Sequence, residues 1–401
     1  MIKINITPLF LKCQVKIIAQ YYDPENDQFY FEARYDKRHI PRCHECGNQS
    51  KNIHSYDNRI IRDLDIMNKK VYINIEYRKI RCKNCGCVRV EDLGILTPHQ
   101  RFTDRLAQYV ILLCKEQNIK WISNTFDLNR ITIKNIHKNH LMKKYKTPDY
   151  SNLRIIAIDE ISMKKGHKYL TNIINYETGE VVYVGEGRKY RTLARFFRKL
   201  KAKEKRKIEA VCIDMWKPYI KAIKKHLPNA AIVFDLFHIV QMFGRIIDKV
   251  RISEYKKLSK DNKDILKGVK YILLRNKRNL GRKDKARLEE ILDINKNLSL
   301  VYIIKDYIKK LWYYKYPKYV IDGITDILNI LRTSGNKILV SFAKRLNKYS
   351  YGIINHCKYK INTSFVEGIN NKIKVIKRKA YGFHDIQYFK LIIMDSFGIS
   401  N

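Results

Sequence analysis

The segments RIIAIDE (154–160) and IEAVCID (208–214) are two short apolar runs that end in carboxylates. Runs of this length, bounded by polar residues, are typical of strands buried inside a sheet. A third run of the same kind, AIVFD, follows at residues 231–235. Amphipathic segments at residues 192–200 and 217–226 are expected to be helices. Strands that alternate with helices predict an α/β domain in which helices cover a mixed sheet.

The predicted strands bring acidic residues together. Asp159 lies at the end of the first run and Asp214 at the end of the second. Open α/β sheets bind ligands beyond the carboxyl ends of their strands, so we expect both carboxylates at that edge. Glu367, on a predicted helix at residues 363–380, is the third candidate, because a glutamate reaches farther from a helix packed there. Three such carboxylates can hold two Mg²⁺ (or Mn²⁺) ions, about 3.5–4 Å apart, around a phosphodiester.

Other roles for these residues stay open. Aspartates at strand ends often cap helices or bind loop amides instead. Beyond Glu367, amides and cations continue along the helix at three- and four-residue steps, which suits a DNA backbone; a solvated basic helix is the competing interpretation. These residues are Asn370, Asn371, Lys374, Lys377 and Arg378. Asp235 and His238, in VFDLFH, are expected to support the metal ligands or to contact phosphate, and their alternative is a capping Asp beside a packed His.

Two cysteine knuckles of the CxxC-G type occur near the N-terminus, CHECG at residues 43–47 and CKNCG at residues 82–86. Each knuckle places two thiolates at one tight turn, and two knuckles supply the four ligands of a tetrahedral zinc. The expected ligands are Cys43, Cys46, Cys82 and Cys85, with Cys87 as an alternative to Cys85. Because four ligands close the coordination sphere, this zinc is expected to stabilise a small domain without doing chemistry. Ordinary buried or redox cysteines are the other interpretation.

The charge of the chain points to nucleic acid. Its 401 residues include 81 Lys and Arg against 39 Asp and Glu, a formal net charge of +42. Such a field attracts polyanions, and binding to phosphates releases counterions; the codon bias of an AT-rich genome is the competing explanation. Cations around the knuckles are expected to meet DNA phosphate: Arg42, Lys51, Arg59, Arg62, Arg78, Lys79, Arg81 and Lys83. No apolar run approaches about 20 residues and no secretory signal is recognisable, so we expect a soluble cytoplasmic protein without a membrane partner.

Residues 106–141 fit three helices joined by short turns. In a helix-turn-helix fold the last helix enters the major groove, and polar residues near its start reach the bases. The residues expected to bind DNA there are Arg130, Thr132, Lys134, Asn135 and Lys138. A generic helical bundle with a solvated lysine face is the alternative, and the basic excess favours the DNA-binding interpretation.

Residues 238–350 carry few strand signals and have helical periodicity, which predicts an all-helical block. With it, the ordered motifs CHECG, CKNCG, AIDE, CIDMWKPY, IVFDLFH and TSFVEGINNKIKVIKRKAYGF resemble those of the ISL3-family insertion-sequence transposases over nearly the whole chain. The resemblance implies a DDE catalytic core with a ribonuclease H-like fold, interrupted by a helical insertion. It places the three catalytic, metal-binding carboxylates at Asp159, Asp214 and Glu367.

The resemblance also implies an organisation into consecutive segments. These are a zinc-ribbon-like domain at 1–97, a helix-turn-helix domain at 98–148, the first part of the catalytic domain at 149–240, the helical insertion at 241–350, and the final catalytic part, with Glu367, at 351–401. The expected chemistry is attack of water on a phosphodiester at the transposon end, followed by attack of the freed 3′-OH on target DNA.

The expected partners are double-stranded DNA of the terminal repeats and of the target, bound by a dimer or larger assembly at the bacterial nucleoid. Two other functions stay open: a non-catalytic DNA-binding regulator derived from a transposase, and a ribonuclease H-like nuclease that cleaves without joining. The intact acidic trio argues against a pure DNA-binding protein, which does not need it. Strand-transfer products separate a transposase from a nuclease.

Overall fold

The computed structural model describes residues 14–97, 99–164, 168–257, 266–362, 364–379 and 384–398. The chain divides into two compact units, Met1–Lys146 and Thr147–Asn401, each with apolar cores of its own. Among the described helices, none is both long and apolar enough to cross a membrane.

The first unit begins with a five-stranded sheet of order β1-β2-β4-β3, in which β5 also pairs with β4. The strands are β1 (Val15–Asp23), β2 (Gln28–Tyr35), β3 (Ile53–Ile66), β4 (Lys69–Cys82) and β5 (Cys87–Val90). β2 and β4 run parallel, and the other pairs are antiparallel. Along β4, Val71, Ile73 and Ile75 are buried between more exposed residues, because successive side chains of a strand point to opposite faces.

Three helices follow this sheet: α1 (Asp104–Glu116), α2 (Ile119–Phe126) and α3 (Arg130–Lys144). Their caps are Thr103, Asn118 and Asn129, whose side chains accept hydrogen bonds from amides of the first turn. These caps satisfy amides that have no partner within the helix. The three helices enclose a small apolar core built on Leu106, Val110, Ile122 and Ile133.

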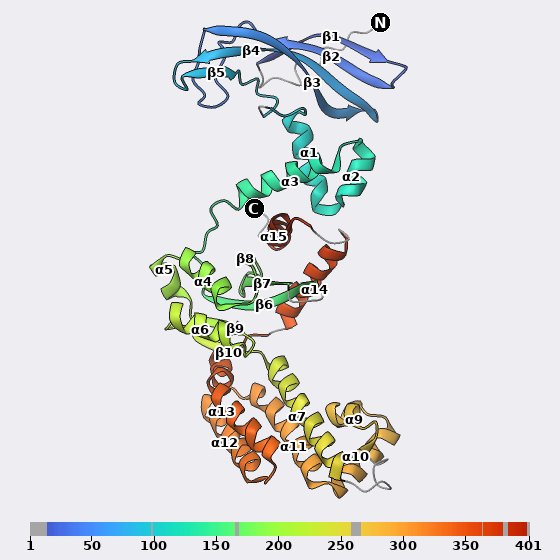
Figure 1. Ribbon diagram of the computed structural model, residues 1–401, viewed down its shortest axis with the longest axis vertical. Helices are drawn as coiled ribbons and strands as arrows, with labels where there is room; N and C mark the ends of the chain where they lie inside the picture. Colours follow the sequence, from blue (N-terminus) through green and yellow to red (C-terminus); the bar gives the residue numbers. More distant parts are fainter. Residues whose placement is uncertain are drawn as a thin grey trace. The chain divides into compact units, whose positions relative to one another are not determined.

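The second unit is built on a mixed five-stranded sheet of order β10-β9-β6-β7-β8 (Figure 1). Its strands are β6 (Ile155–Lys164), β7 (Lys168–Asn175), β8 (Val181–Glu186), β9 (Ala210–Ile213) and β10 (Ala231–Phe234). β10, β9 and β6 run parallel, whereas β7 and β8 continue the sheet in antiparallel order. The three apolar runs identified in the sequence form the three parallel strands, and the predicted mixed α/β fold is confirmed.

Helices cover both faces of this sheet. They are α4 (Tyr190–Lys199) and α6 (Lys217–His226) on one face, near the short α5 (Ala202–Lys207), and α14 (Ser364–Lys379) and α15 (Ile386–Ser396) on the other. Along β6, Ile156 and Ile158 belong to the core beneath α4 and α6. Ala157 and Ile161 belong instead to the core beneath α14 and α15. The alternation places Asp159 on the α14 face.

A helical block lies between β10 and α14 in the chain. Its described elements are α7 (Leu236–Lys257), α9 (Lys270–Leu274), η3 (Lys277–Asn279), α10 (Arg282–Ile294), α11 (Lys296–Lys310), η4 (Leu311–Tyr313), α12 (Pro317–Thr333) and α13 (Lys337–Lys358). Its apolar core continues into the core beneath α4 and α6. α13 packs on β10, where Nδ2 of Asn355 donates a 2.9 Å hydrogen bond to the carbonyl of Ile232. Helices α7 and α13 run without a break through residues 240 and 350, where the sequence placed the limits of the insertion.

Candidate active site and metal cluster

Asp159, Asp214 and Asp235 lie in a row across three adjacent strands. In the parallel strands β6 and β9, Asp159 and Asp214 each lie two residues beyond a paired position. Asp235 directly follows β10, whose last residue pairs with the residue before Asp214. Asp159 does not end its strand as the sequence predicted, because β6 continues to Lys164 in its hairpin with β7. The three carboxylates nevertheless occupy one edge of the parallel strands.

Each aspartate of this row also binds a backbone amide. Oδ1 of Asp159 accepts from the amide of Glu160 at 2.7 Å, and Oδ1 of Asp214 accepts from the amide of Trp216 at 3.2 Å. Oδ1 of Asp235 accepts from the amide of Phe237 at 2.7 Å, in the first turn of α7. The aspartates therefore bind backbone amides, the kind of role that the sequence left open. They can still bind other groups, since each carboxylate oxygen has two lone pairs.

A pocket of about 220 Å³ opens at this edge of the sheet. The row of aspartates lines it together with Glu160, His238 from α7, and Glu367, Asn370 and Lys374 from α14. The α14 residues face the pocket together because they follow one another at three- and four-residue steps of a helix. The structure thus gathers all three predicted carboxylates, with Asp235 and His238, around one pocket. Glu367 itself is exposed, in the first turn of α14.

The pocket is electrostatically unfavourable for its carboxylates. Burial raises the pKa of Asp159 and of Asp214 above the ordinary aspartate value, and neighbouring carboxylates raise both further, against an opposing effect of His238. Burial also raises the pKa of Glu160 to about 7. Nε2 of His238 lies 3.8 Å from Oδ2 of Asp235. Crowded, buried carboxylates of this kind ionise readily only when a cation lies near them.

Asn370 and Asn172 complete the site in a way that the sequence analysis did not foresee. Nδ2 of Asn370 donates to Oδ2 of Asp159 at 2.5 Å, and Oδ1 of Asn370 accepts from Nδ2 of Asn172 at 3.3 Å. Both asparagines are buried. Asn172 is the cross-strand partner of Asp159 in the β6–β7 hairpin. The pairing of the β6–β7 hairpin could have indicated that Asn172 lies beside Asp159. The three-residue step from Glu367 along the helix could have indicated that Asn370 faces the same pocket.

The predicted DNA-binding residues of α14 divide into two groups. Asn371, Lys374 and Arg378 are exposed, and Nζ of Lys374 donates to Oδ1 of Asn371 at 3.2 Å. Lys377 instead donates to the carbonyl groups of Ser162 and Met163, at 3.3 and 2.5 Å. Its ammonium group therefore ties α14 to β6.

The candidates on α3 also differ in exposure. Arg130 and Asn135 are exposed, whereas Thr132, Lys134 and Lys138 are half-buried. Asn129, just before them, uses its side chain to cap the helix.

The four cysteines of the two knuckles form a compact cluster in the first unit. The Sγ atoms of Cys43, Cys46, Cys82 and Cys85 all lie within 4.8 Å of one another, and among the described residues no other group of three or more His, Cys, Asp or Glu meets this condition. The separations include 3.9 Å for Cys43–Cys85 and 3.5 Å for Cys46–Cys82. A tetrahedral site with zinc–sulfur bonds of about 2.3 Å requires sulfur–sulfur separations of ~3.8 Å. The cluster therefore fits zinc.

Glycines allow the tight turns of the two knuckles, which bring Cys85, and not Cys87, into the cluster. Gly47 and Gly86 have φ values of 73° and 69°, which side chains disfavour. Their amides donate to the carbonyls of Cys43 and Cys82 at 2.8 and 3.0 Å. Cys87 lies outside the cluster, exposed, with its thiol donating to the carbonyl of Cys85. Cys85, rather than Cys87, is therefore the fourth member.

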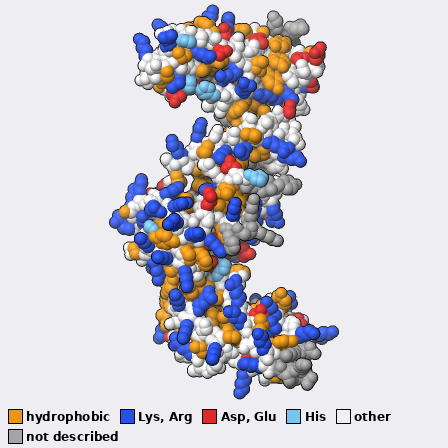
Figure 2. Space-filling view, viewed as in Figure 1, with side chains coloured by type: hydrophobic (Ala, Val, Ile, Leu, Met, Phe, Trp, Pro, Cys, Tyr) orange, Lys and Arg blue, Asp and Glu red, His pale blue; other side chains and the backbone are white. Residues whose placement is uncertain are grey.

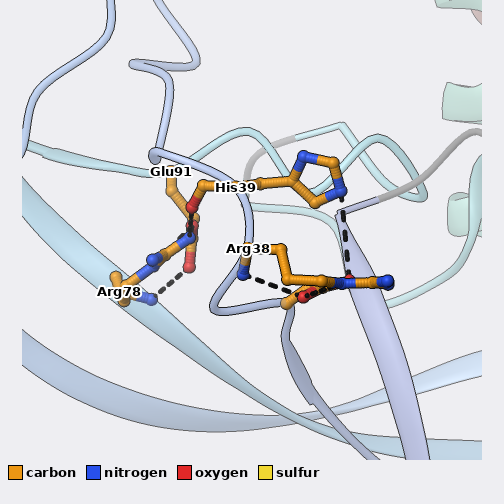
Figure 3. A network of polar contacts seen from close by, with 5 residues as sticks. Arg38, His39, Arg78 and Glu91 are labelled. Carbon is orange, nitrogen blue, oxygen red and sulfur yellow. Dashed lines mark hydrogen bonds and ion pairs between the residues drawn. The ribbon is translucent and has the colours of Figure 1, made fainter.

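Two of the cations expected to meet DNA near the knuckles are buried in the protein. Arg78 forms an ion pair with Glu91 at 2.6 Å, and their side chains are 5% and 0% exposed. The backbone carbonyl of His39 also accepts from Arg78, beside the Arg38–Asp36 pair (Figure 3). Arg62 is buried as well and pairs with Asp65 at 2.5 Å. Both arginines were assigned to DNA because their carboxylate partners could not be foreseen, and that prediction was wrong.

The remaining cations of that group differ in their surroundings. Four are exposed and suit a polyanion: Arg42, Lys51, Arg81 and Lys83. Lys79 pairs with Asp57 at 2.8 Å, and the guanidinium of Arg59 lies 5.2 Å from the centre of the Tyr77 ring.

Two models of known protein families match this chain. A model of the ISL3-type DDE transposase, described as a transposase, matches residues 156–393. A second model, described as the zinc-finger of transposase IS204/IS1001/IS1096/IS1165, matches residues 40–85. The chain belongs to the ISL3 family of insertion-sequence transposases. The first match contains all three carboxylates, and the second ends at Cys85, before Cys87.

Curated relatives support the same family over most of the chain. The transposase for insertion sequence element IS1001 of Bordetella parapertussis is 38% identical over 358 residues, which cover 88% of this chain and 88% of the relative. The transposase for insertion sequence element IS1557 of Mycobacterium tuberculosis is 23% identical over 393 residues, covering 87% and 84%. The family resemblance drawn from the motifs is confirmed. The chain is an insertion-sequence transposase of the DDE type, with a zinc-ribbon domain.

Proposed function

We propose that Asp159, Asp214 and Glu367 form the catalytic centre of this ISL3-family transposase, in a domain of ribonuclease H-like fold. The centre cuts DNA at the transposon ends and joins the freed 3′ ends to target DNA. The observation that carries the proposal is the pocket in which all three carboxylates meet. Two of them come from neighbouring parallel strands and the third comes from α14, more than 150 residues later in the chain.

The residues of the pocket fit a pair of Mg²⁺ or Mn²⁺ ions. Carboxylate oxygens are the ligands that these cations prefer, and a cation favours the ionised form of crowded, buried aspartates. Two ions about 3.5–4 Å apart, with bonds of about 2.1 Å, span ligands up to about 8 Å from one another. The oxygens of the three carboxylates can therefore lie farther apart than the cysteine sulfurs, which are all within 4.8 Å of one another. When bound, the ions would polarise the scissile phosphodiester and lower the pKa of the attacking hydroxyl.

The residues around the carboxylates have supporting roles in this proposal. Asn370 holds the carboxylate of Asp159 in position, and Asp235 and His238 line the same pocket as further polar groups. Lys374, from the next turn of α14, contributes a cation to the pocket wall where a DNA phosphate would lie.

DNA binding is assigned to the basic surface of both units. Lys and Arg side chains are spread widely over the visible face, and Asp and Glu are sparse there (Figure 2). We assign α1 to α3 to a helix-turn-helix, in which Arg130 and Asn135 of α3 contact bases or phosphates of the terminal repeat. Arg378 and Asn371 of α14 are assigned to the DNA backbone near the cut. Because two transposon ends must be held together, a dimer or larger assembly is expected on DNA.

The test uses purified full-length protein, Mn²⁺ or Mg²⁺, and a labelled duplex that carries the terminal repeat read from the DNA bordering the gene. Asp214→Asn should bind this duplex as the parent does and lose cleavage and strand transfer. Asp322→Asn, an exposed residue of α12, is the matched control and should remain active. Cleavage by Asp214→Asn at the parental rate would refute the assignment. A parent protein that binds without cutting would be a DNA-binding regulator, and one that cuts without joining would be a nuclease.

A further inference from the structure

The loop between β8 and α4 is held rigidly at its backbone. Gly187 has a φ of 83°, so the chain makes a turn there that a side chain would disfavour. Three consecutive backbone carbonyl groups here accept hydrogen bonds from side chains of the surrounding structure. The carbonyl of Glu186 accepts from Thr192 at 3.0 Å, and that of Gly187 accepts from Thr171 at 2.6 Å. The carbonyl of Arg188 accepts from Nε1 of Trp216 at 2.9 Å. The loop therefore presents Arg188 in a fixed position.

The guanidinium of Arg188 lies between two aromatic rings. Its central carbon is 4.1 Å from the centre of the Tyr169 ring and 5.1 Å from that of Trp216. Within the described ranges, no carboxylate oxygen lies within 4.0 Å of this guanidinium and no protein group accepts a hydrogen bond from it. An arginine held against aromatic faces keeps its charge and its planar array of donors. These donors remain available to an anion.

Arg188 stands next to the proposed catalytic centre. Trp216, which contacts it, lies two residues after Asp214 and donates its own amide to that carboxylate. The positive charge of Arg188 also acts on both Asp214 and Glu160, holding their pKa values lower than burial alone would. Trp216 is 38% exposed, so this side of the site is accessible from solvent.

We propose that Arg188 is a phosphate-binding positioning residue, whose guanidinium binds one backbone phosphate of the DNA strand that enters the pocket of Asp159, Asp214 and Glu367. A planar guanidinium matches the two free oxygens of a phosphodiester and forms two parallel hydrogen bonds with them. The aromatic rings fix its plane in advance, so less side-chain entropy is lost on binding. The bound phosphate in turn fixes the register of the neighbouring scissile bond. This inference rests on the proposed function, because it takes that pocket as the place of cleavage.

The experiment combines protein variants with single neutral linkages in the DNA. A methylphosphonate replaces one charged phosphate oxygen with a methyl group, and it is placed in turn at each linkage flanking the cleavage position of the transposon-end duplex. With the parent protein, the methylphosphonate at one of these linkages should reduce the cleavage rate by about tenfold to a hundredfold, as expected for loss of a hydrogen bond between charged groups. Arg188→Gln should show a similar loss on unmodified DNA and no further loss at that linkage.

Matched variants separate this contact from general effects. Arg191→Gln removes the same charge from an exposed position three residues along the chain, and it should retain the parental sensitivity at that linkage. Arg188→Lys keeps the charge without the planar donors and should lose most of the linkage-specific effect. Tyr169→Phe keeps the ring and should behave as the parent, whereas Tyr169→Leu should resemble Arg188→Gln.

The outcomes distinguish the two proposals. If Arg188→Gln and Arg188→Lys both keep the full parental penalty at every linkage, Arg188 does not bind phosphate, and only this inference is overturned. If Asp214→Asn cleaves at the parental rate, the proposed function itself fails, whatever Arg188 does. A loss of thermal stability in Arg188→Gln with an unchanged linkage pattern would make Arg188 a purely structural counter-charge, and it would also overturn the inference.

Discussion

Nδ2 of Asn370 donates a 2.5 Å hydrogen bond to Oδ2 of Asp159, joining α14 to β6 across 211 residues of sequence. Asn172 fixes the orientation of this amide by donating to its oxygen at 3.3 Å. The donor nitrogen of Asn370 is therefore defined by the network, and it must face the carboxylate. A carboxylate held on one side in this way presents its remaining lone pairs to the pocket in one orientation.

Asn370→Ala should lower the cleavage rate by about 10- to 100-fold, the usual effect of removing a group that orients a metal ligand. The loss should be largest at low Mn²⁺ concentration, because a mobile Asp159 binds the cation less well. Titration of cleavage against Mn²⁺ measures this. Asn371→Ala, which changes the exposed neighbour, is the control and should leave the Mn²⁺ dependence unchanged. An unchanged Mn²⁺ dependence in Asn370→Ala would mean that the hydrogen bond has no role in metal binding.

The cysteine cluster predicts different outcomes for two cysteines that lie two residues apart. Cys85→Ser should lose most of its zinc and destabilise the first unit, because the free energy of zinc binding is also free energy of folding. Cys87→Ser should keep about one zinc ion per chain, since Cys87 lies outside the cluster. Elemental analysis of the purified variants measures the zinc content. Loss of zinc from Cys87→Ser, with zinc retained in Cys85→Ser, would reverse the ligand assignment.

The buried pair Arg78–Glu91 should matter for stability. Glu91→Gln leaves the buried guanidinium of Arg78 without a counter-charge, and breaking such a pair costs about 3–5 kcal/mol of unfolding free energy. Denaturant unfolding of the variant measures this loss. Asp57→Asn breaks the more exposed pair with Lys79 and should have little effect. If both variants lose equal stability, burial is not what gives the Arg78–Glu91 pair its importance.

The sequence predicted the parts of the structure that follow from local pattern. Apolar runs ending in Asp159 and Asp214 are visible by eye, and parallel strands bring such residues to one edge. The CxxC-G knuckles are also a local pattern, because the spacing alone places two thiolates at one turn. Burial of Arg78 could not be predicted, because nothing near it in the sequence distinguishes it from exposed cations such as Arg81. Its burial depends on Glu91, which only the folded sheet brings close.

The same distinction explains what was missed around the active site. The role of Asn370 depends on the rotation of α14 about its axis when it packs on the sheet. One step further along the helix, Asn371 is exposed, and the sequence offers no reason to separate the two. The limits of the helical insertion stay a prediction, because α7 and α13 run unbroken through both of them. Continuous helices leave no loop signal at residues 240 and 350.

Lys305 predicts a pH dependence in the helical block. Burial lowers its pKa to about 8, although its ammonium donates to the carbonyls of Leu273 and Arg275 at 2.9 and 2.7 Å. A lysine in the unfolded chain has a pKa of about 10.4, so between these two pKa values the unfolded state binds more protons than the folded state. The contribution of Lys305 to unfolding free energy should therefore rise with pH across that window and be constant below it.

The difference between the parent and Lys305→Met isolates this contribution from that of the tyrosines. The unfolding free energies of the parent and of Lys305→Met are measured at several pH values between 7 and 10.5. The value for the parent should rise relative to that of the variant as the pH increases. Lys310→Met removes an exposed lysine from the same helix and serves as the control. A parent and Lys305→Met that run parallel across the whole range would show that the buried lysine keeps its ordinary pKa.

Gly352 of α13 is expected to control the position of Asp235. A Cβ at this position would overlap the buried ring of Phe234, the last residue of β10 and the one before Asp235. Gly352→Ala should therefore lose about 1–3 kcal/mol from overpacking, which outweighs the gain of about 0.5–1 kcal/mol from replacing glycine in a helix. Gly368→Ala, on α14, meets nothing within 4 Å and should be stabilising instead. Thermal unfolding of both variants tests the contrast, and the cleavage rate of Gly352→Ala shows whether the displaced ring disturbs the row of aspartates. If Gly352→Ala is as stable as Gly368→Ala and cuts DNA at the parental rate, the packing of α13 on β10 does not set the geometry of the site.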